Sequence, residues 1–253
     1  PSGPAPRGRS LAVGVFDAPR DRLVIFGGYD GASFLGDAWE LALGGATAWD
    51  SLATSGGPPP ARDLAASAFD SSREQMVVFG GWNGTNFLDD TWTLSLNGPP
   101  VWTPLTPLTT PIIRRGCTMV YDAPDDELVL FGGHTLYGLA SDVWSLSLTD
   151  PSNWQQLTPD PSPTVVQRYG HTGIFDPVGH ELVTFGGHKA TWVFGHDFSG
   201  IANGGRTNEV CRMDLGASPS WRLGNTPALQ RYSVAFDPVA RDVLMFSGLR
   251  AAL

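Results

Sequence analysis

A short apolar run that ends in two glycines recurs along the chain, and this repeat constrains the fold more than any other feature. It reads LVIFGG at residues 23–28, MVVFGG at 76–81, LVLFGG at 128–133 and LVTFGG at 182–187, with a divergent copy, VLMFSG, at 243–248. Successive copies begin 53, 52, 54 and 61 residues apart. A nearly fixed period of this length is typical of proteins built from an array of similar structural units.

The residues before each glycine pair predict a β-hairpin. An arginine is followed eight residues later by the aspartate of an aromatic–Asp pair, and the first glycine comes ten residues after that aspartate. The segment between them separates two apolar runs and holds Asp, Ser, Pro and Gly, which favour turns. The arginines and aspartates are Arg9 and Asp17, Arg62 and Asp70, Arg114 and Asp122, Arg168 and Asp176, and in a shorter fifth unit Arg231 and Asp237.

Two tryptophans mark the second half of the repeat. The first, at Trp39, Trp92 and Trp144, lies eleven residues after the glycine pair in a run that alternates apolar and polar residues, as half-buried strands do. The second lies ten residues further on in each of these units, at Trp49, Trp102 and Trp154, and its fourth copy is Trp221. Four strands in every unit predict propeller blades, with the tryptophans as wedges between neighbouring blades.

The double glycine and the two tryptophans at this spacing resemble the Kelch repeat over nearly all of residues 9–248. The resemblance implies an all-β fold, a Kelch-type β-propeller with four complete four-stranded blades plus a partial fifth. The expected blades are residues 9–56, 62–108, 114–160, 168–226 and 231–248, with tails at 1–8 and 249–253. Secreted and periplasmic bacterial Kelch proteins look most similar, which implies an extracellular or periplasmic location.

Two departures from the Kelch pattern bear on the closure of the ring and on the site. Kelch propellers usually have six or seven blades, so this chain closes with an incomplete fifth blade, belongs to a longer propeller or is completed by another chain. We expect a five-unit ring, and an oligomer if the ring is incomplete. In the fourth unit, thirteen additional residues separate the glycine pair from Cys211, which replaces the first tryptophan. Long insertions in repeat arrays often shape a binding site.

The composition argues against several classes of function. Only 16% of the residues are charged and the net charge is −9, so the basic patch of a nucleic-acid-binding protein is not expected. No apolar run approaches the ~18 residues that a membrane-spanning helix needs. Cys117 and Cys211 occupy unrelated repeat positions within predicted strands, where buried free thiols are expected rather than a disulfide.

The direction of the strands predicts where a site lies. In each blade the first strand begins just after the arginine and the second ends at the glycine pair, so antiparallel pairing places both points at the same end. We expect these residues to line one mouth of the central channel, where Kelch proteins often hold ligands. They are Tyr29, Trp82, His134 and His188 after the glycines, and Ser10, Asp63, Arg115, Tyr169 and Tyr232 after the arginines, with His171 two residues beyond Tyr169.

These side chains suggest two alternative chemistries. Aromatic rings with a few polar groups in a concavity suit a small aromatic or carbohydrate ligand, for which the expected binding residues are Tyr29, Trp82, Tyr232, His171 and Trp192. The rival is general acid–base catalysis, with His134 or His188 as acid or base and Asp63, Tyr169 or Arg115 orienting a substrate. The structural interpretation of the same rings is packing against neighbouring loops.

The other polar residues of the repeat have structural interpretations. The arginines are expected to donate to loop carbonyls, and Asp37, Asp90 and Asp142 to accept from turn amides. The acidic segments 89–90 and 125–127 are expected to be solvated turns, with a Ca²⁺ site as the alternative. No cofactor is expected. A divalent metal drawing on His134, His171, His188, His196 and Asp197 is the alternative, although these residues lack a close ligand spacing.

We therefore expect a ligand-binding or interaction propeller that holds a small aromatic or carbohydrate ligand at the mouth of its channel. The first alternative is a small-molecule enzyme, a hydrolase, lyase or isomerase, that uses His134 or His188 at the same mouth. The second is a structural fragment of a larger extracellular protein. Fold alone does not decide among them, because one fold supports many functions.

Overall fold

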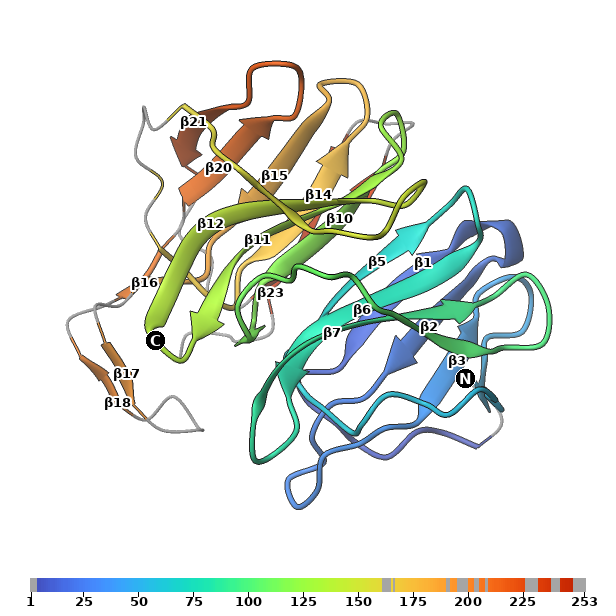
Figure 1. Cartoon of the computed structure of the whole chain (residues 1–253). Coiled ribbons are helices and arrows are strands. Elements are labelled where there is room, and N and C mark those ends of the chain that lie inside the picture. The colour runs from blue at the N-terminus through green and yellow to red at the C-terminus, as the bar shows by residue number, and fades with distance from the viewer. Residues whose placement is uncertain are drawn as a thin grey trace. The chain divides into compact units, whose positions relative to one another are not determined.

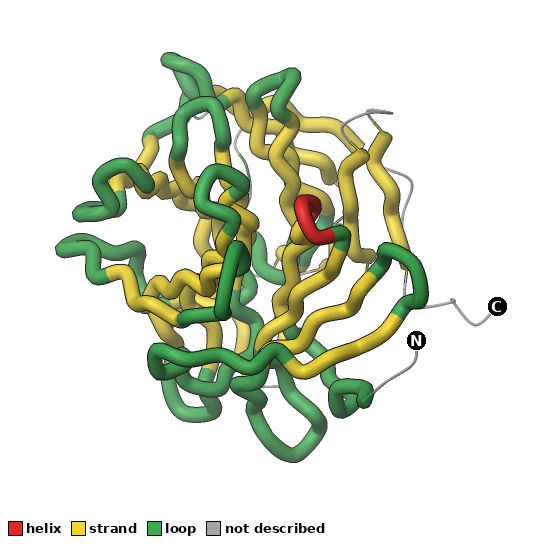
Figure 2. The backbone as a smooth tube through the Cα atoms, turned by 90° about the vertical axis from the view of Figure 1, so that its right-hand side faces the viewer, coloured by secondary structure: helices red, strands yellow, loops and turns green. Residues whose placement is uncertain are grey.

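The computed structural model describes residues 4–160, 165, 167–189, 192–194, 200–202, 205–207, 209–225, 232–237 and 242–247. Contacts divide the chain into two compact units, Pro1–Arg115 with Ser147–Trp154, and Gly116–Leu146 with Gln155–Leu253. Strands form nearly all of the described regular structure, and the helical element in these ranges is the 3-10 turn η1 (Ala18–Arg20), red in Figure 2. No described helix is long and apolar enough to cross a membrane.

The first unit contains two antiparallel sheets whose strands are paired in chain order (Figure 1). One sheet consists of β1 (Val13–Asp17), β2 (Arg22–Phe26), β3 (Ala38–Ala42) and β4 (Ala48–Ser51). The other consists of β5 (Ala66–Asp70), β6 (Gln75–Trp82), β7 (Phe87–Ser95) and β8 (Trp102–Leu105), and the short strand β9 (Arg114–Arg115) follows it. Such four-stranded meanders are the blades of propeller folds.

The second unit repeats this arrangement. Its first blade runs β10 (Thr118–Asp122), β11 (Glu127–Thr135), β12 (Gly138–Ser147) and β13 (Gln155–Leu157), and its second runs β14 (Thr172–Asp176), β15 (Glu181–Phe185), β20 (Glu209–Asp214) and β21 (Ser220–Asn225). A further sheet has two strands, β22 (Tyr232–Asp237) and β23 (Asp242–Ser247). The prediction of an all-β Kelch-type propeller, with four four-stranded blades and a partial fifth, is therefore confirmed.

The insertion in the fourth blade folds into two short strand pairs between β15 and β20. β16 (His188–Lys189) pairs with β19 (Gly205–Arg206), and β17 (Trp192–Phe194) pairs with β18 (Gly200–Ala202). The blade itself is kept, because β15 pairs directly with β20. The additional residues thus extend one hairpin of the blade and leave the four-stranded meander unbroken.

The glycine pair directly follows β2 and β15 and lies within β6 and β11. In the first blade its backbone touches the next blade. Gly27 and Gly28 have φ values of +69° and +101°, in the left-handed region that side chains disfavour. A Cβ on Gly27 would lie 2.6 Å from the carbonyl oxygen of Arg62 in the second blade, and one on Gly28 would lie 2.7 Å from that of Ser10. Glycine is therefore needed here both for its conformation and for the close approach.

The second tryptophan of a blade packs against the phenylalanine that precedes the glycine pair of the blade before it. The ring centroids are 4.8 Å apart for Phe26 and Trp102, 5.4 Å for Phe79 and Trp154, and 5.0 Å for Phe131 and Trp221. Trp102 is only 1% exposed, whereas Trp92, a first tryptophan, lies partly buried at the edge of the same core. The wedge is thus the second tryptophan in the second, third and fourth blades, whereas Trp49 of the first blade is only partly buried.

Each unit has its own hydrophobic core between neighbouring blades. Val24, Met76 and Leu94 lie in the core of the first unit, and Leu182 and Cys211 in that of the second. Cys117 and Cys211 are buried free thiols, as predicted. Burial raises the pKa of the Cys211 thiol, so this side chain behaves as a small apolar group where other blades have a tryptophan.

Replacing Trp102 by alanine is expected to lower the free energy of unfolding by about 3–5 kcal/mol, because a large buried ring leaves a cavity. The matched variant Trp92→Ala removes a partly buried ring and is expected to cost about 1–3 kcal/mol. Chemical denaturation followed by circular dichroism gives both values. An equal or larger loss for Trp92→Ala would contradict the assignment of the wedge to the second tryptophan.

Candidate functional site

An arginine, an acid and a tryptophan of the same blade form a hydrogen-bonded group beside the glycine pair, which we call the clamp. In the second blade, the Arg62 guanidinium donates to the Gly80 carbonyl at 2.9 Å and to the two carboxylate oxygens of Asp90 at 2.6 and 2.8 Å. The Trp92 indole N–H donates to the same carboxylate at 2.7 Å. Burial alone would raise the pKa of Asp90, but the adjacent Arg62 outweighs it and the pKa is lowered.

The first blade has the same clamp. Arg9 donates to the Gly27 carbonyl at 3.0 Å and to the Asp37 carboxylate at 2.6 and 2.9 Å, and the Trp39 indole donates to Asp37 at 2.6 Å. The Arg9 guanidinium lowers the pKa of Asp37 to about 2.

The prediction that the repeat arginines donate to loop carbonyls is confirmed. The prediction that Asp37 and Asp90 accept from turn amides is wrong, because these carboxylates accept from arginine and indole groups.

The fourth blade keeps the arginine and changes its partners. Arg168 donates to the Gly186 carbonyl at 3.3 Å and to Glu209 at 2.9 Å. Glu209 stands where the other blades have aspartate, and Lys189 at the start of the insertion also donates to it. Because Cys211 cannot supply the indole donor, a lysine from the insertion takes that place in the clamp.

Beyond the clamp, in the first, second and fourth blades, the backbone pairs the residue after the arginine with the residue after the glycine pair. Isolated antiparallel bridges join Ser10 to Tyr29, Asp63 to Trp82, and Tyr169 to His188. In the second blade the Asp63 and Trp82 N–H groups each donate to the other residue's carbonyl, at 3.0 and 2.9 Å. The structure therefore brings each of these pairs together at one end of its blade.

Two aromatic pairs form a surface in the first unit, which we call the hairpin-end surface and define as Tyr29, Phe34, Trp82 and Phe87. The ring centroids are 5.0 Å apart within each pair, Tyr29 with Phe34 and Trp82 with Phe87. A Cβ on Gly84 would lie 2.8 Å from the Phe34 ring, so this ring of the first blade lies against the turn of the second. All four rings are partly exposed.

A short turn inside each aromatic pair fixes the position of its rings. The Asp30 carboxylate accepts from the Ala32 and Ser33 N–H groups at 2.9 and 2.7 Å. The Asn83 carbonyl accepts from the N–H groups at 85 and 86 at 2.9 and 2.8 Å. Such side-chain bonds order a turn locally, so the surface is formed in advance.

Arg115 supports the rings of the second blade from within the protein. Its guanidinium carbon lies 5.5 Å from the Trp82 ring centroid and 5.1 Å from that of Phe87, within the range of a cation–π interaction. Arg115 and Asp63 are each only 2% exposed. Two of the three residues predicted to orient a substrate are therefore buried beside the hairpin-end surface.

In the second unit, three rings lie together at the corresponding end of the blades, and two of them are stacked. Tyr169 and His188 have centroids 5.2 Å apart and planes 23° apart, and His134 lies 6.1 Å from Tyr169. Tyr169 and His134 are buried, whereas His188 is partly exposed. Just beyond His134, at the tip of the β11–β12 hairpin, Leu136 and Tyr137 are exposed.

His171 lies in the interior of the second unit. Its ring meets Phe131 edge-on, with centroids 5.0 Å apart. Burial and the positive charge of Arg168 lower the pKa of His171 to about 3. The imidazole is consequently neutral near pH 7, and its surroundings are those of a core side chain.

Some predicted residues lie beyond what the structure describes, and two aromatic residues escaped the sequence analysis. Trp192 and Tyr232 lie on β17 and β22, where only the backbone is described, and residues 196–197 are outside the described ranges. Phe34 and Phe87 were missed because they lie on the returning arm of the hairpin, Phe34 in an isolated bridge to Tyr29 and Phe87 at the start of β7. Each follows the post-glycine aromatic by five residues, and this shared spacing could have revealed them.

Side chains that could bind a metal ion lie close together at the opposite end of the hairpins, in the turns between the first and second strands of the blades. Within the described ranges, one group of three could share an ion, Asp122, Asp125 and His180, whose ligand atoms all lie within 4.8 Å of one another. The predicted histidine set does not contribute to this group.

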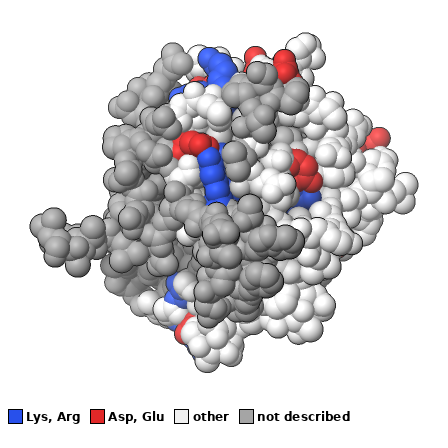
Figure 3. Space-filling view, turned by 90° about the vertical axis from the view of Figure 1, so that its left-hand side faces the viewer, with Lys and Arg blue, Asp and Glu red and all other residues white. Residues whose placement is uncertain are grey.

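On the face in Figure 3, the described Lys and Arg side chains lie beside Asp or Glu and do not gather in a patch of one sign.

Known proteins share this repeat. A family model described as the KLHDC2/KLHL20/DRC7 Kelch-repeats domain matches residues 1–187. The chain is 30% identical to Adagio-like protein 3 of Oryza sativa subsp. japonica over 256 residues, which cover 92% of this chain and 37% of that protein. It is 33% identical to Leucine-zipper-like transcriptional regulator 1 of Homo sapiens over 156 residues, 55% of this chain and 17% of the relative.

These comparisons also limit what the resemblance implies. The chain spans well under half the length of the curated relatives that it matches. The matched proteins named above come from a plant and an animal, so they do not support the narrower resemblance to secreted bacterial Kelch proteins.

The stability of the protein is expected to fall as the pH drops below 6.5, because of His171. Its folded pKa of about 3 lies below the ordinary value of 6.5, so the unfolded state binds an additional proton between these values. Stability is therefore lost through this window, by up to about 1.4 kcal/mol per pH unit. Urea denaturation at several pH values should show a shallower dependence for His171→Gln, and an unchanged dependence would contradict the assignment.

The Arg9 clamp predicts the titration of Asp37. Carbon-13 NMR of the carboxyl group should give a pKa of about 2 in the wild type. In Arg9→Ala the pKa should rise toward 3.8, because the largest cause of its lowering, the hydrogen bond from Arg9, is removed. A pKa that does not change in this variant would show that the ion pair is absent in solution.

Proposed function

Because the chain belongs to the Kelch-repeat family, whose propellers typically serve as protein-interaction domains, we propose that it binds a segment of a partner protein on its hairpin-end surface. The observation that carries this proposal is the continuity of partly exposed aromatic rings from the first blade to the second. Tyr, Trp and Arg are the residue types that contribute most binding energy in protein interfaces.

The rigidity of this surface favours binding. The rings flank turns that are already held by Asp30 and Asn83, and Arg115 packs against two of them. A surface that is ordered before it meets its partner loses less conformational entropy on association. Association with a partner would therefore carry a smaller entropic cost at this surface.

A small aromatic or carbohydrate ligand is the second candidate for the same rings. Aromatic faces stack on such ligands, but a sugar also needs directed hydrogen bonds. The side-chain oxygens of Asp30 and Asn83 already accept from their own turns. They are therefore less available to orient a sugar, and this favours a protein segment.

The geometry supports catalysis less well. An acid or base must come within hydrogen-bonding distance of its substrate. His134, Tyr169, Asp63 and Arg115 are all buried, and His171 is held neutral in the interior. Among the residues predicted for catalysis, His188 is the one with a partly exposed side chain, and its ring is stacked on Tyr169.

A phage-displayed peptide library panned against the immobilised chain tests the proposal. Selected peptides are synthesised and their dissociation constants are measured by isothermal titration calorimetry. Trp82→Ala and Phe34→Ala are each expected to weaken binding about 30-fold, which corresponds to the loss of a hot-spot side chain. The matched control is Leu108→Ala, which truncates an 87% exposed leucine outside the hairpin-end surface and should leave the affinity unchanged.

Circular dichroism must first show that all three variants are folded. Peptides that bind Trp82→Ala and Phe34→Ala as tightly as the wild type would contradict the proposed site. Enrichment of no peptide, together with binding to a glycan array or an aromatic fragment that Trp82→Ala abolishes, would favour the small-ligand alternative.

A further inference from the structure

The aspartate that ends the first strand of a blade is neutralised by an arginine in the first two blades. Asp17 and Asp70 are fully buried. Three residues after each aspartate stands an arginine whose guanidinium lies on the carboxylate, Arg20 at 3.0 Å from Asp17 and Arg73 at 3.1 Å from Asp70. A buried carboxylate needs such a partner, because burial otherwise disfavours its charge.

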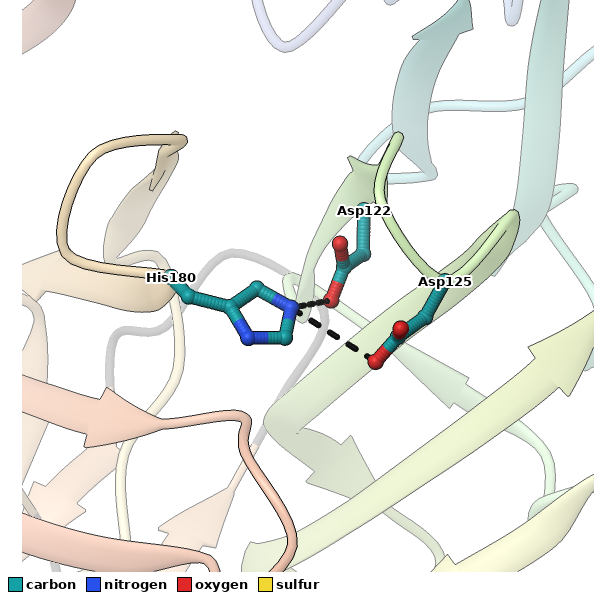
Figure 4. A group of neighbouring side chains, drawn as sticks. All are labelled: Asp122, Asp125 and His180. Carbon is teal, nitrogen blue, oxygen red and sulfur yellow. Dashed lines mark hydrogen bonds and ion pairs between the residues drawn. The ribbon is translucent and has the colours of Figure 1, made fainter.

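The third blade replaces this arginine with an acid. Asp122 is equally buried, but the residue three positions later is Asp125. The basic group that meets the pair is His180, which comes from the turn between β14 and β15 in the next blade (Figure 4). Its Nε2 lies 2.8 Å from Asp122 Oδ2 and 3.6 Å from Asp125 Oδ2.

At the equivalent contact between the first two blades the charges are reversed. There the earlier blade supplies the basic group and the later blade supplies the acid. Glu74 and His180 occupy the same turn position, four residues after the aspartate that ends the first strand of their blade, with φ values of +49° and +51°. Glu74 forms an ion pair with Arg20 of the preceding blade. The third blade has therefore exchanged a guanidinium–carboxylate pair for two carboxylates and an imidazole.

One oxygen of Asp122 also lacks the hydrogen bonds of its counterpart. Oδ1 of Asp70 accepts from the N–H groups of residues 72 and 73, each at 3.0 Å. At the position that matches residue 72, the third blade has Pro124, which carries no N–H. Within the described part of the chain, Asp122 Oδ1 is buried and has no hydrogen-bond partner.

We propose that Asp122, Asp125 and His180 form a site for a divalent first-row transition-metal ion such as Zn²⁺. All three side chains point toward one another across the gap between the two turns (Figure 4). An imidazole with two carboxylates is a ligand set that suits zinc, with water completing the coordination. The cation then supplies the positive charge that arginine supplies in the first two blades.

The two ligand spacings from His180 fit this ion with small adjustments. Bonds of about 2.0 Å in a tetrahedral site place ligand atoms about 3.3 Å apart. The 3.6 Å pair of His180 and Asp125 is near this value, and the 2.8 Å pair of His180 and Asp122 has to open by about half an ångström. Calcium fits less well, because it prefers six to eight oxygen ligands, and Asp126 is bonded to the Tyr121 hydroxyl at 2.8 Å.

The test uses the whole chain, freed of metal with a chelator, at pH 7.5, where most imidazole is neutral. Isothermal titration calorimetry with ZnCl₂ should give one site that Asp125→Asn or His180→Asn weakens at least about tenfold. At a Zn²⁺ concentration about 100 times Kd, the melting temperature should rise by roughly 5 °C or more. Mg²⁺ and Ca²⁺ should have little effect. The matched control Asp150→Asn, an exposed acid elsewhere, should bind zinc like the wild type.

A second variant keeps the proposal testable if the substitutions to asparagine impair folding. Asp125→Arg restores the arginine of the first two blades, so it should abolish the response to zinc and melt no lower than the wild type without metal. Zinc binding of equal affinity in all variants would place the ion elsewhere and overturn the proposal. Melting that depends on pH through His180 but does not respond to zinc would identify a proton-linked ion pair instead, and would overturn it as well.

Discussion

The close approach of one blade's backbone to the next, at the glycine pair, is the constraint on which the rest of this structure depends. The Gly28 N–H donates to the Arg62 carbonyl at 2.8 Å, and in the second unit Gly133 donates to Arg168 at 2.9 Å. The same arginines turn their guanidinium groups to the glycine carbonyl and the acid of their own blade. One residue type thus joins the main chains of two blades and anchors the third strand of its own.

This arrangement fixes the positions of the aromatic rings at the ends of the hairpins. Arginine side chains hold the backbone at the glycine pair through its carbonyl group. The aromatic residues just after the pair therefore have a defined position. Tyr29 and Trp82 then pair with Phe34 and Phe87 across short turns, and the first blade's ring reaches the second blade's turn. At the other end of the hairpins the blades meet through charges, and there the third and fourth blades depart from the pattern of the first two.

Much of the fold follows from the sequence because its signals are local and repeated. The spacing from arginine to aspartate to glycine predicts the hairpins, and antiparallel pairing predicts that Asp63 and Trp82 meet. Long-range side-chain contacts could not be predicted in this way. The partner of Asp37 is Arg9, 28 residues away in the sequence, and that of Asp122 is His180, 58 residues away. The burial of His134 and Arg115 likewise depends on neighbouring elements that no single repeat describes.

Glycine is required at the pair because the next blade leaves no room for a side chain. Two glycines with nearly the same φ value test this directly. Gly80 and Gly170 have φ values of +62° and +61°, but a Cβ would lie 2.7 Å from the Arg114 carbonyl oxygen at Gly80 and would meet nothing within 4 Å at Gly170. Both alanine variants bear the same backbone strain. Equilibrium denaturation should therefore show that Gly80→Ala loses at least about 2 kcal/mol more than Gly170→Ala. Equal losses would mean that conformation alone selects glycine, and would contradict the account.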